Sequence, residues 1–270
     1  MAMWAPAKEG KSELALWCAV HLALGRDPWT LEPTEPVDVA YFDYEMTEDD
    51  LGDRLDGFGI NPLELGRLHY ALLPRLHALD TERGGLELEH YVREVGARAA
   101  VIDTYGRAVG GDENEADTVR AFYRFTGSRL KAMGVGYWRT DHAGKDPTKG
   151  QRGSSAKAED VDIIWRMRRG KDGGADLDCS KSSRVGWVAP HLHLDRVTVG
   201  DALRYTTPLR FTWPEAVLAK AVELDTVGLP LTAGRRSAEA ALRSAGIVPG
   251  RGVTIDEALE YRRERGASSP

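Results

Sequence analysis

The chain has little cysteine and no long apolar run, and both absences narrow its class. Its 270 residues include only Cys18 and Cys179, which lie far apart and lack the spacing of a metal site. This usage excludes a disulfide-stabilised scaffold and favours a reducing, cytoplasmic compartment. No stretch reaches the ~18 consecutive apolar residues that indicate a membrane-spanning helix, and the first residues do not resemble a signal peptide. We therefore expect a soluble protein with no membrane contact.

Basic residues are scarce in the first half of the chain and concentrated just after it. Residues 1–128 carry 12 Lys and Arg against 24 Asp and Glu, whereas residues 129–184 carry 13 against 8. A basic stretch of this kind is either an ordinary solvated surface or a contact for the phosphates of a nucleotide or nucleic acid.

Apolar runs bounded by turn residues alternate with helical patterns, which is typical of a parallel sheet wrapped by helices. The runs predict strands at residues 37–44, 67–72, 97–104, 135–141 and 161–167. The helical patterns predict helices at residues 11–24, 48–57, 86–95, 115–133, 214–224, 234–245 and 255–265. Thr47 and Asp50 predict a capping box, and residues 183–190 and 191–197 are candidate hairpin arms. We predict an α/β domain over residues 1–205 and a small helical region over residues 206–270, whose pattern is similar to a helix-turn-helix unit.

A phosphate-binding loop lacking only its first glycine opens the chain. It is the segment Ala5-Pro6-Ala7-Lys8-Glu9-Gly10-Lys11-Ser12, followed at once by a helical pattern. Backbone N–H groups at a helix N-terminus favour bound phosphate. Because a Gly-Lys-Ser triplet also begins helices that bind nothing, other residues must decide between the two interpretations.

Two carboxylates follow buried strands and fit this loop. Asp103 ends the apolar run 99–103, where a Mg²⁺ ligand beside a phosphate loop belongs; otherwise it merely terminates the strand. Glu45 follows the run 39–44, at the sheet edge where α/β proteins bind ligands. There it could orient the water that attacks a γ-phosphate or accept its proton, or it could cap the helix beginning at Glu48.

The motifs together resemble the RecA-like ATPases of the plasmid RepA replicative helicase group, which share their core with DnaB-type helicases. The resemblance covers about residues 2–197. It rests on the phosphate loop with Phe42-Asp43-Tyr44-Glu45-Met46-Thr47, Val101-Ile102-Asp103-Thr104, Gly111-Asp112-Glu113-Asn114, Asp141-His142-Ala143-Gly144-Lys145-Asp146 and Arg152-Gly153-Ser154-Ser155.

The resemblance implies a RecA-like P-loop fold that binds ATP and Mg²⁺. Lys11 would contact the β and γ phosphates, Ser12 and Asp103 would hold Mg²⁺, and Glu45 would be the catalytic base. His142 would sense the γ-phosphate. The family usually has two histidines there, and in this chain Asp141 replaces the first.

The resemblance also implies partners. The loop 143–159 is rich in glycine and lysine and is either a mobile connection or a surface that faces single-stranded DNA. Arg184 is similar to an arginine finger that reaches a neighbour's nucleotide, with Arg166 and Arg168 as alternatives. A finger acting between subunits implies a homo-oligomer, a hexameric ring by analogy with the family.

Two functions remain open after this reasoning. One is an ATP-hydrolysing DNA motor of a plasmid, phage or integrated element, and the other is a nucleotide-switched DNA-binding or loading protein with little unwinding. The arginine-rich region after residue 212 is either a DNA-binding unit or a helical interaction module. Only residues 1–4 remain to form the strand before the phosphate loop. We expect that strand to be shortened, with neighbouring backbone groups partly unpaired, and the natural reading frame to begin upstream.

Overall fold

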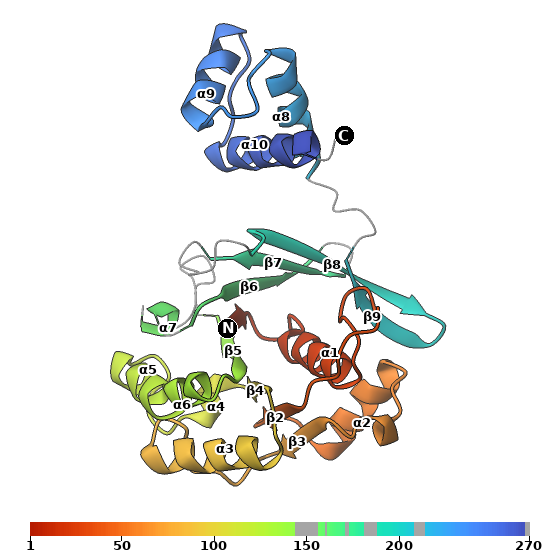
Figure 1. Cartoon of the computed structure of the whole chain (residues 1–270), viewed down its shortest axis with the longest axis vertical. Helices are drawn as coiled ribbons and strands as arrows, with labels where there is room; N and C mark the ends of the chain where they lie inside the picture. The colour runs from red at the N-terminus through yellow and green to blue at the C-terminus, as the bar shows by residue number, and fades with distance from the viewer. Residues whose placement is uncertain (144–155, 160, 171–172, 181–187, 208–213, 268–270) are drawn as a thin grey trace. The chain divides into compact units, whose positions relative to one another are not determined.

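The computed structural model describes residues 1–143, 156–159, 161–170, 173–180, 188–207 and 214–267. The chain divides into two compact units, Met1–Thr207 and Pro208–Pro270 (Figure 1). Each unit has its own buried core, and each is described separately below.

The described residues of the first unit form a nine-stranded sheet. Its strands are β1 (Ala2–Ala5), β2 (Val39–Asp43), β3 (Leu68–Leu72), β4 (Ala99–Asp103), β5 (Gly136–His142), β6 (Ile164–Arg169), β7 (Ala175–Cys179), β8 (His191–Val199) and β9 (Ala202–Thr206). Their order is β3-β2-β4-β5-β1-β6-β7-β8-β9. The strands from β3 to β6 in this order are parallel, and β6 to β9 are antiparallel.

Helices cover both faces of the parallel part of the sheet. One core contains α1 (Lys11–Ala23) and α2 (Glu48–Gly57). The other contains α3 (Glu82–Glu94), α4 (Tyr105–Ala108), α5 (Ala116–Phe122) and α6 (Ser128–Ala132). Short elements complete this unit, namely the 3₁₀ turn η1 (Pro62–Glu64), the π-helical turn η2 (Tyr123–Gly127) and α7 (Ala156–Glu159). β1 and β2 are buried along their whole length because both of their faces lie under helices. This is the layered arrangement of a RecA-like P-loop fold.

Several local predictions are confirmed. The five predicted strands correspond to β2, β3, β4, β5 and β6, with ends that shift by a few residues. The predicted helix 48–57 has the bounds of α2, and Thr47 and Asp50 form its capping box. The predicted helix 115–133 is interrupted by η2, which brings the Phe125 carbonyl against Gly85 of α3. A Cβ on Gly85 would lie 2.0 Å from that oxygen, so close packing of the two helices accompanies the wider turn.

Two predictions need correction. The hairpin differs from the prediction in its first arm. The predicted arm 191–197 lies within β8, which pairs with β7 and β9, but residues 188–190 lie outside any strand and residues 183–187 are outside the described residues. The β7–β8 register places Leu177 opposite Leu192, so that Leu177 is buried in the core and Leu192, partly buried, packs against it. β1 is short, as expected, but its backbone is paired on both sides, with β5 and with β6. The Met1 amino group also donates to the Tyr137 carbonyl at 2.7 Å.

The described residues of the second unit form a bundle of three helices, α8 (Glu215–Thr226), α9 (Arg235–Ser244) and α10 (Gly252–Ala267). Its core includes Val217, Leu224, Leu242 and Ile255. Three arginines of this unit, Arg235, Arg243 and Arg262, pair with acids of the same unit. Arg262, buried, donates to Asp225 at 2.7 Å, and Arg235 donates to Asp256 at 3.0 Å.

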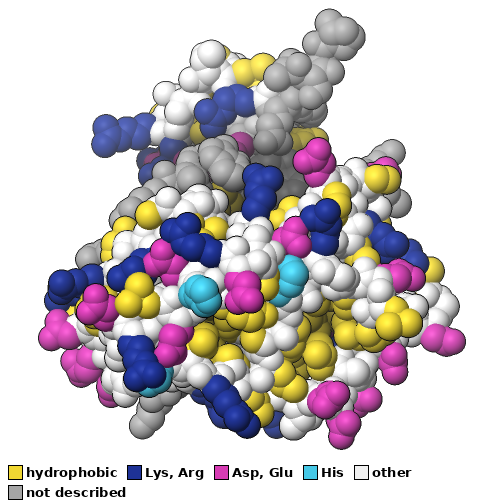
Figure 2. Space-filling model, turned by 60° about the horizontal axis from the view of Figure 1, so that its bottom comes forward, with side chains coloured by type: hydrophobic (Ala, Val, Ile, Leu, Met, Phe, Trp, Pro, Cys, Tyr) yellow, Lys and Arg dark blue, Asp and Glu magenta, His cyan; other side chains and the backbone are white. Residues whose placement is uncertain are grey.

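Surface charge on the face shown in Figure 2 is mixed in sign. Hydrophobic side chains gather near the middle of this face, and Lys, Arg, Asp, Glu and His side chains border them (Figure 2). No single-sign field marks this face. In the part of the chain that the structure describes, no helix is long and apolar enough to cross a membrane.

Candidate active site

A hollow of about 390 Å³ lies where the parallel strands end. Open α/β sheets bind ligands at this carboxyl edge because the loops and helix N-termini meet there. Its walls come from the phosphate loop, from α1 and α2, from the residues that follow β2 and β4, and from the last residue of β5. The lining residues are Ala7, Lys8, Gly10, Lys11, Ser12, Glu13, Glu45, Arg54, Thr104 and His142.

The phosphate loop has the backbone that its sequence requires. Gly10 is the N-cap of α1 with φ 95°, a left-handed conformation that favours glycine. Lys8 also has a positive φ, of 67°. Ala5 still belongs to β1, so the missing first glycine stands in extended strand rather than in the turn. The Glu9 carboxylate turns away from the hollow and accepts the backbone N–H of Arg169 at 2.6 Å.

The Lys11 side chain carries a buried charge without a carboxylate partner. It is 6% exposed, and its Nζ donates to the carbonyl oxygens of Ala5 and Pro6, both at 3.2 Å. No ion pair found among the described residues includes it. Burial lowers the pKa of Lys11, while the nearby carboxylates of Asp103 and Glu45 act in the opposite direction. A phosphate in the hollow would supply the missing counter-charge at the N-terminus of α1.

Ser12 and Asp103 meet as Mg²⁺ ligands would. The Ser12 hydroxyl donates to Asp103 Oδ1 at 3.1 Å. A hydroxyl and a carboxylate are oxygen ligands of the kind that Mg²⁺ prefers, so this pair would hold the ion beside the phosphate loop. Thr140 donates to the same oxygen, and Tyr41 donates to Oδ2 at 2.8 Å. Burial raises the pKa of Asp103 and these donors lower it, so a cation here would relieve an unfavourable buried charge.

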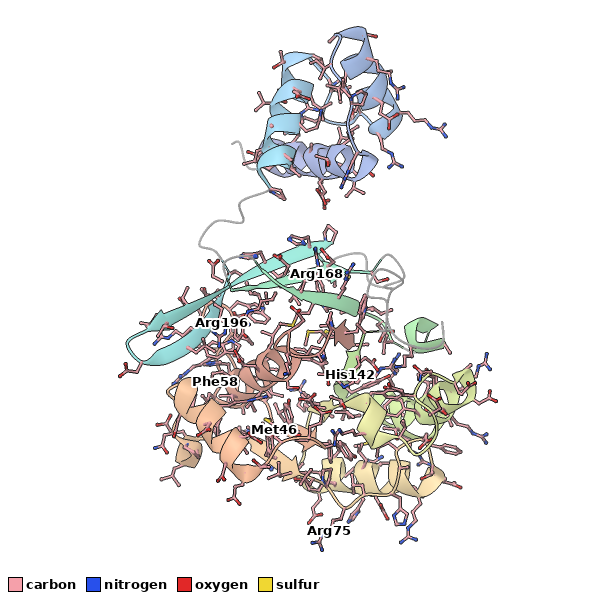
Figure 3. All side chains as sticks on the ribbon, turned by 180° about the vertical axis from the view of Figure 1, so that it is seen from behind. Met46, Phe58, Arg75, His142, Arg168 and Arg196 are labelled. Atoms are coloured by element: carbon pink, nitrogen blue, oxygen red, sulfur yellow. The ribbon has the colours of Figure 1, made fainter. Side chains whose placement is uncertain are left out.

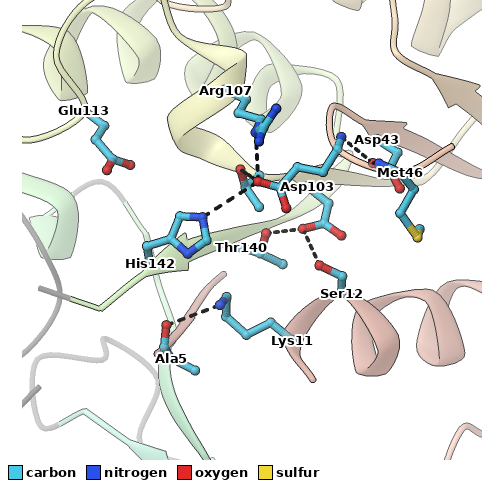
Figure 4. A network of polar contacts seen from close by, with 12 residues as sticks. Ala5, Lys11, Ser12, Asp43, Met46, Asp103, Arg107, Glu113, Thr140 and His142 are labelled. Atoms are coloured by element: carbon cyan, nitrogen blue, oxygen red, sulfur yellow. Dashed lines mark hydrogen bonds and ion pairs between the residues drawn. The ribbon is translucent and has the colours of Figure 1, made fainter. Parts of the chain in front are cut away.

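Glu45 is presented to the hollow by a turn that Asp43 holds. Asp43 Oδ1 accepts the backbone N–H groups of Glu45 at 2.8 Å and Met46 at 2.9 Å (Figure 4). Oε1 of Glu45 lies 2.9 Å from Arg107 Nε and 3.8 Å from His142 Nε2. Glu45 lines the same hollow as the phosphate loop and does not cap a helix; Thr47 caps α2 instead.

Strand β5 contributes to the site because it lies between β4 and β1. Its side chains alternate between the two faces of the sheet. Thr140 and His142 lie on the side of Asp103 and Glu45. Arg139 and Asp141 lie on the other side, fully buried and joined at 3.1 Å. Asp141, which replaces the first histidine of the family's His-His pattern, therefore faces away from the hollow. Of the two positions, only His142 lines the hollow.

Sequence reasoning missed Arg54. This arginine lies in the last turn of α2 and lines the hollow, and its Nη1 is buried without a hydrogen-bond partner in the described structure. An orphaned guanidinium nitrogen fits an anionic ligand. In the sequence, Arg54 stands out only as the one basic residue among the acids of 48–57. The packing of α2 is what brings it close to the phosphate loop.

The predicted finger and the DNA-facing loop are not placed. Arg184 and residues 144–155 lie outside the described residues. Of the alternatives, Arg168 donates to Asp178 at 2.7 Å, and Arg166 lies over the Trp4 ring at 5.3 Å. Arg196 of β8 donates to Glu13 Oε1 at 3.0 Å; Arg168, Arg196 and His142 are labelled in Figure 3. Among the described residues, no cluster of three His, Cys, Asp or Glu side chains could hold a metal.

Comparison with known proteins agrees with this geometry. No curated protein matches the chain. A family model described as AAA domain matches residues 1–148, which include the phosphate loop, Glu45, Asp103 and His142. Since the match covers more than half of the 270 residues, the chain belongs to the AAA domain family of P-loop ATPases.

Proposed function

We propose that this protein is an ATP-hydrolysing RecA-like motor that acts on DNA, of the RepA and DnaB-like replicative helicase kind. The observation that carries the proposal is the convergence of Lys11, the Ser12–Asp103 pair and Glu45 on one hollow at the sheet edge. Phosphoryl transfer needs charge neutralisation and positioning more than covalent chemistry, and these residues supply both.

Each residue has a role in this proposal. Lys11 and the first N–H groups of α1 bind the phosphates, and Arg54 adds a second positive charge. Mg²⁺, held by Ser12 and Asp103, would neutralise charge on the phosphates. Glu45 orients the attacking water and takes its proton at Oε2, while Oε1 stays with Thr104 and Arg107. His142, 3.8 Å from the same carboxylate, lies where the state of the γ-phosphate would be sensed.

The action on DNA rests on the sequence. The basic stretch 129–184 and the resemblance to helicases support single-stranded DNA as the partner of the loop 143–159. Arg184 as a finger between subunits supports a homo-oligomeric ring. The ATPase rate with and without single-stranded DNA tests whether the loop 143–159 contacts DNA. A monomeric mass, together with an activity per subunit that does not change on dilution, would contradict the ring.

Lys11→Ala and Glu45→Gln separate binding from chemistry. Lys11→Ala should abolish ATP binding because it removes the phosphate's counter-charge. Glu45→Gln should bind ATP normally and lose turnover by ~10²–10⁴-fold, the usual contribution of a general base. Binding is measured with a fluorescent ATP analogue and turnover by phosphate release. Normal turnover in Glu45→Gln would refute its role.

The second candidate is a nucleotide-switched DNA-binding or loading protein. The separate core of the unit 208–270 favours it, because a compact appendage provides a place for a second binding function. Strand displacement on a forked duplex distinguishes the candidates. Stimulated ATPase with unwinding supports the motor, and sequence-specific duplex binding without unwinding supports the loader.

A further inference from the structure

Two tyrosines stack beneath the candidate active site. Tyr41 of β2 and Tyr70 of β3 are register partners across adjacent parallel strands. Their rings are 4.8 Å apart between centroids and nearly parallel, at 11°. Tyr41 is fully buried and Tyr70 is partly buried. The stack therefore holds two hydroxyl groups at fixed, neighbouring positions under the sheet edge.

Each hydroxyl donates to one of two buried carboxylates. Tyr41 donates to Asp103 Oδ2 at 2.8 Å, and Tyr70 donates to Asp43 Oδ2 at 2.5 Å. Asp43 and Asp103 are themselves register partners on β2 and β4, and both are 1% exposed. Two carboxylates this close and this buried repel each other, so each needs donors to remain in place.

In each aspartate, the second oxygen serves the site. Asp103 Oδ1 accepts from Ser12, the other candidate Mg²⁺ ligand. Asp43 Oδ1 accepts the backbone N–H groups of Glu45 and Met46, which set the turn that carries the base. A tyrosine therefore orients one oxygen of each carboxylate while the other oxygen faces a functional group. Burial raises the pKa of both tyrosines, so they remain donors at neutral pH.

We propose that Tyr41 and Tyr70 are positioning residues with separate tasks: Tyr41 orients the Mg²⁺-binding carboxylate of Asp103, and Tyr70 holds, through Asp43, the turn that presents Glu45. This inference rests on the proposed ATPase function. It differs from a purely structural role, because core filling alone would change stability without separating metal dependence from turnover.

The test uses full-length phenylalanine variants, which keep the stacked ring and remove one hydroxyl. Tyr41→Phe should raise the Mg²⁺ concentration needed for half-maximal turnover and for half-maximal ATP-dependent thermal stabilisation by ~10-fold, the usual effect of losing a residue behind a metal ligand. Binding of a fluorescent ATP analogue in EDTA should not change. Tyr70→Phe should lower kcat by ~10-fold while the KM for ATP and the Mg²⁺ dependence stay as in the wild type.

Tyr44→Phe is the matched control. Tyr44 lies between Asp43 and Glu45, and its hydroxyl is buried with no hydrogen-bond partner in the described structure, so both kinetic readouts should stay unchanged. Urea unfolding of each variant verifies folding. Asp43→Asn provides a second test of the turn, since it replaces one of two acceptor oxygens with an NH₂ group that only donates. The variant must either reverse the contact with Tyr70 or lose the acceptor of the Glu45 and Met46 N–H groups, and it too should lower kcat.

The outcomes are distinguishable. Unchanged Mg²⁺ dependence in Tyr41→Phe, or unchanged kcat in both Tyr70→Phe and Asp43→Asn, would overturn the corresponding half of the proposal. Equal effects of all three tyrosine variants on every readout would indicate packing alone. A wild-type protein that binds no ATP would instead contradict the proposed function.

Discussion

Lys11 and Lys157 are both buried, yet their surroundings differ in kind. Lys157 Nζ lies 3.0 Å from Asp141 and 4.0 Å from Glu113, on the side of β5 that faces α4 and α5. Lys11, on the other side, contacts only carbonyl oxygens among its described hydrogen-bond partners. A buried cation with carboxylates is already neutralised, whereas one without them leaves a place for an anion. The contrast indicates that one side of β5 holds a neutralised structural cluster and that the other side fits a bound anion.

The charged cluster around Lys157 should be sensitive to loss of one member. Lys157→Met should lower the free energy of unfolding by about 3 kcal/mol, because removing one partner of a buried ion pair leaves Asp141 incompletely neutralised. Urea unfolding followed by tryptophan fluorescence measures this loss. Lys131→Met is the control, since its pair with Asp162 at 3.2 Å is largely solvated and should contribute under about 1 kcal/mol. If Lys157→Met and Lys131→Met lowered the free energy of unfolding equally, the buried ion pair would be no more important for stability than the exposed one.

His21 is a third buried polar side chain to compare with Lys11 and Lys157, and it has neither a hydrogen-bond partner among the described residues nor a charge at neutral pH. Both ring nitrogens lack hydrogen-bond partners among the described residues, and burial, with Arg26 and Arg204 nearby, lowers the pKa of His21 from 6.5 to about 4. The unfolded chain therefore takes up this proton first as the pH falls. Neutral His21 therefore contributes about 3 kcal/mol to the free energy of unfolding. This contribution is fully present above about pH 6.5 and is lost progressively as the pH falls toward 4.

His21→Leu should remove this pH dependence. The difference in unfolding free energy between wild type and variant, measured at several values between pH 7.5 and pH 4, should change by about 3 kcal/mol in favour of the variant as the pH falls. If the unfolding free energies of wild type and variant changed with pH in parallel, the His21 imidazole would accept a proton as readily in the folded state as in the unfolded chain.

Lys11→Met should have the smallest effect on stability. Its charge is not paired with a carboxylate, and burial already disfavours it, so unfolding in the absence of nucleotide should change by under about 1 kcal/mol. The same variant should lose the thermal stabilisation that ATP gives the wild type. A destabilisation as large as that of Lys157→Met would show that Lys11 is part of the folded core instead of an anion site.

Local signals made much of the site predictable. Gly10-Lys11-Ser12, Asp103 and Glu45 follow or precede elements whose periodicity is plain, and parallel strands bring their ends together. The helix 48–57 and its capping box were predictable because Thr47 and Asp50 act within one turn. The first arm of the hairpin was not predictable, since β7 is short and alternates acids with apolar residues, and only its register with β8 shows which residues are buried.

The sequence by itself determined the phosphate loop, the two carboxylates and the parallel α/β class, because each depends on neighbours along the chain or on a repeating period. The tertiary structure alone decided that β5 lies between β4 and β1, that Thr140 therefore reaches Asp103, that Arg54 enters the hollow, and that Asp141 belongs to a buried ion cluster. These pairings join residues far apart in the chain. They depend on strand order and packing, which no local pattern encodes.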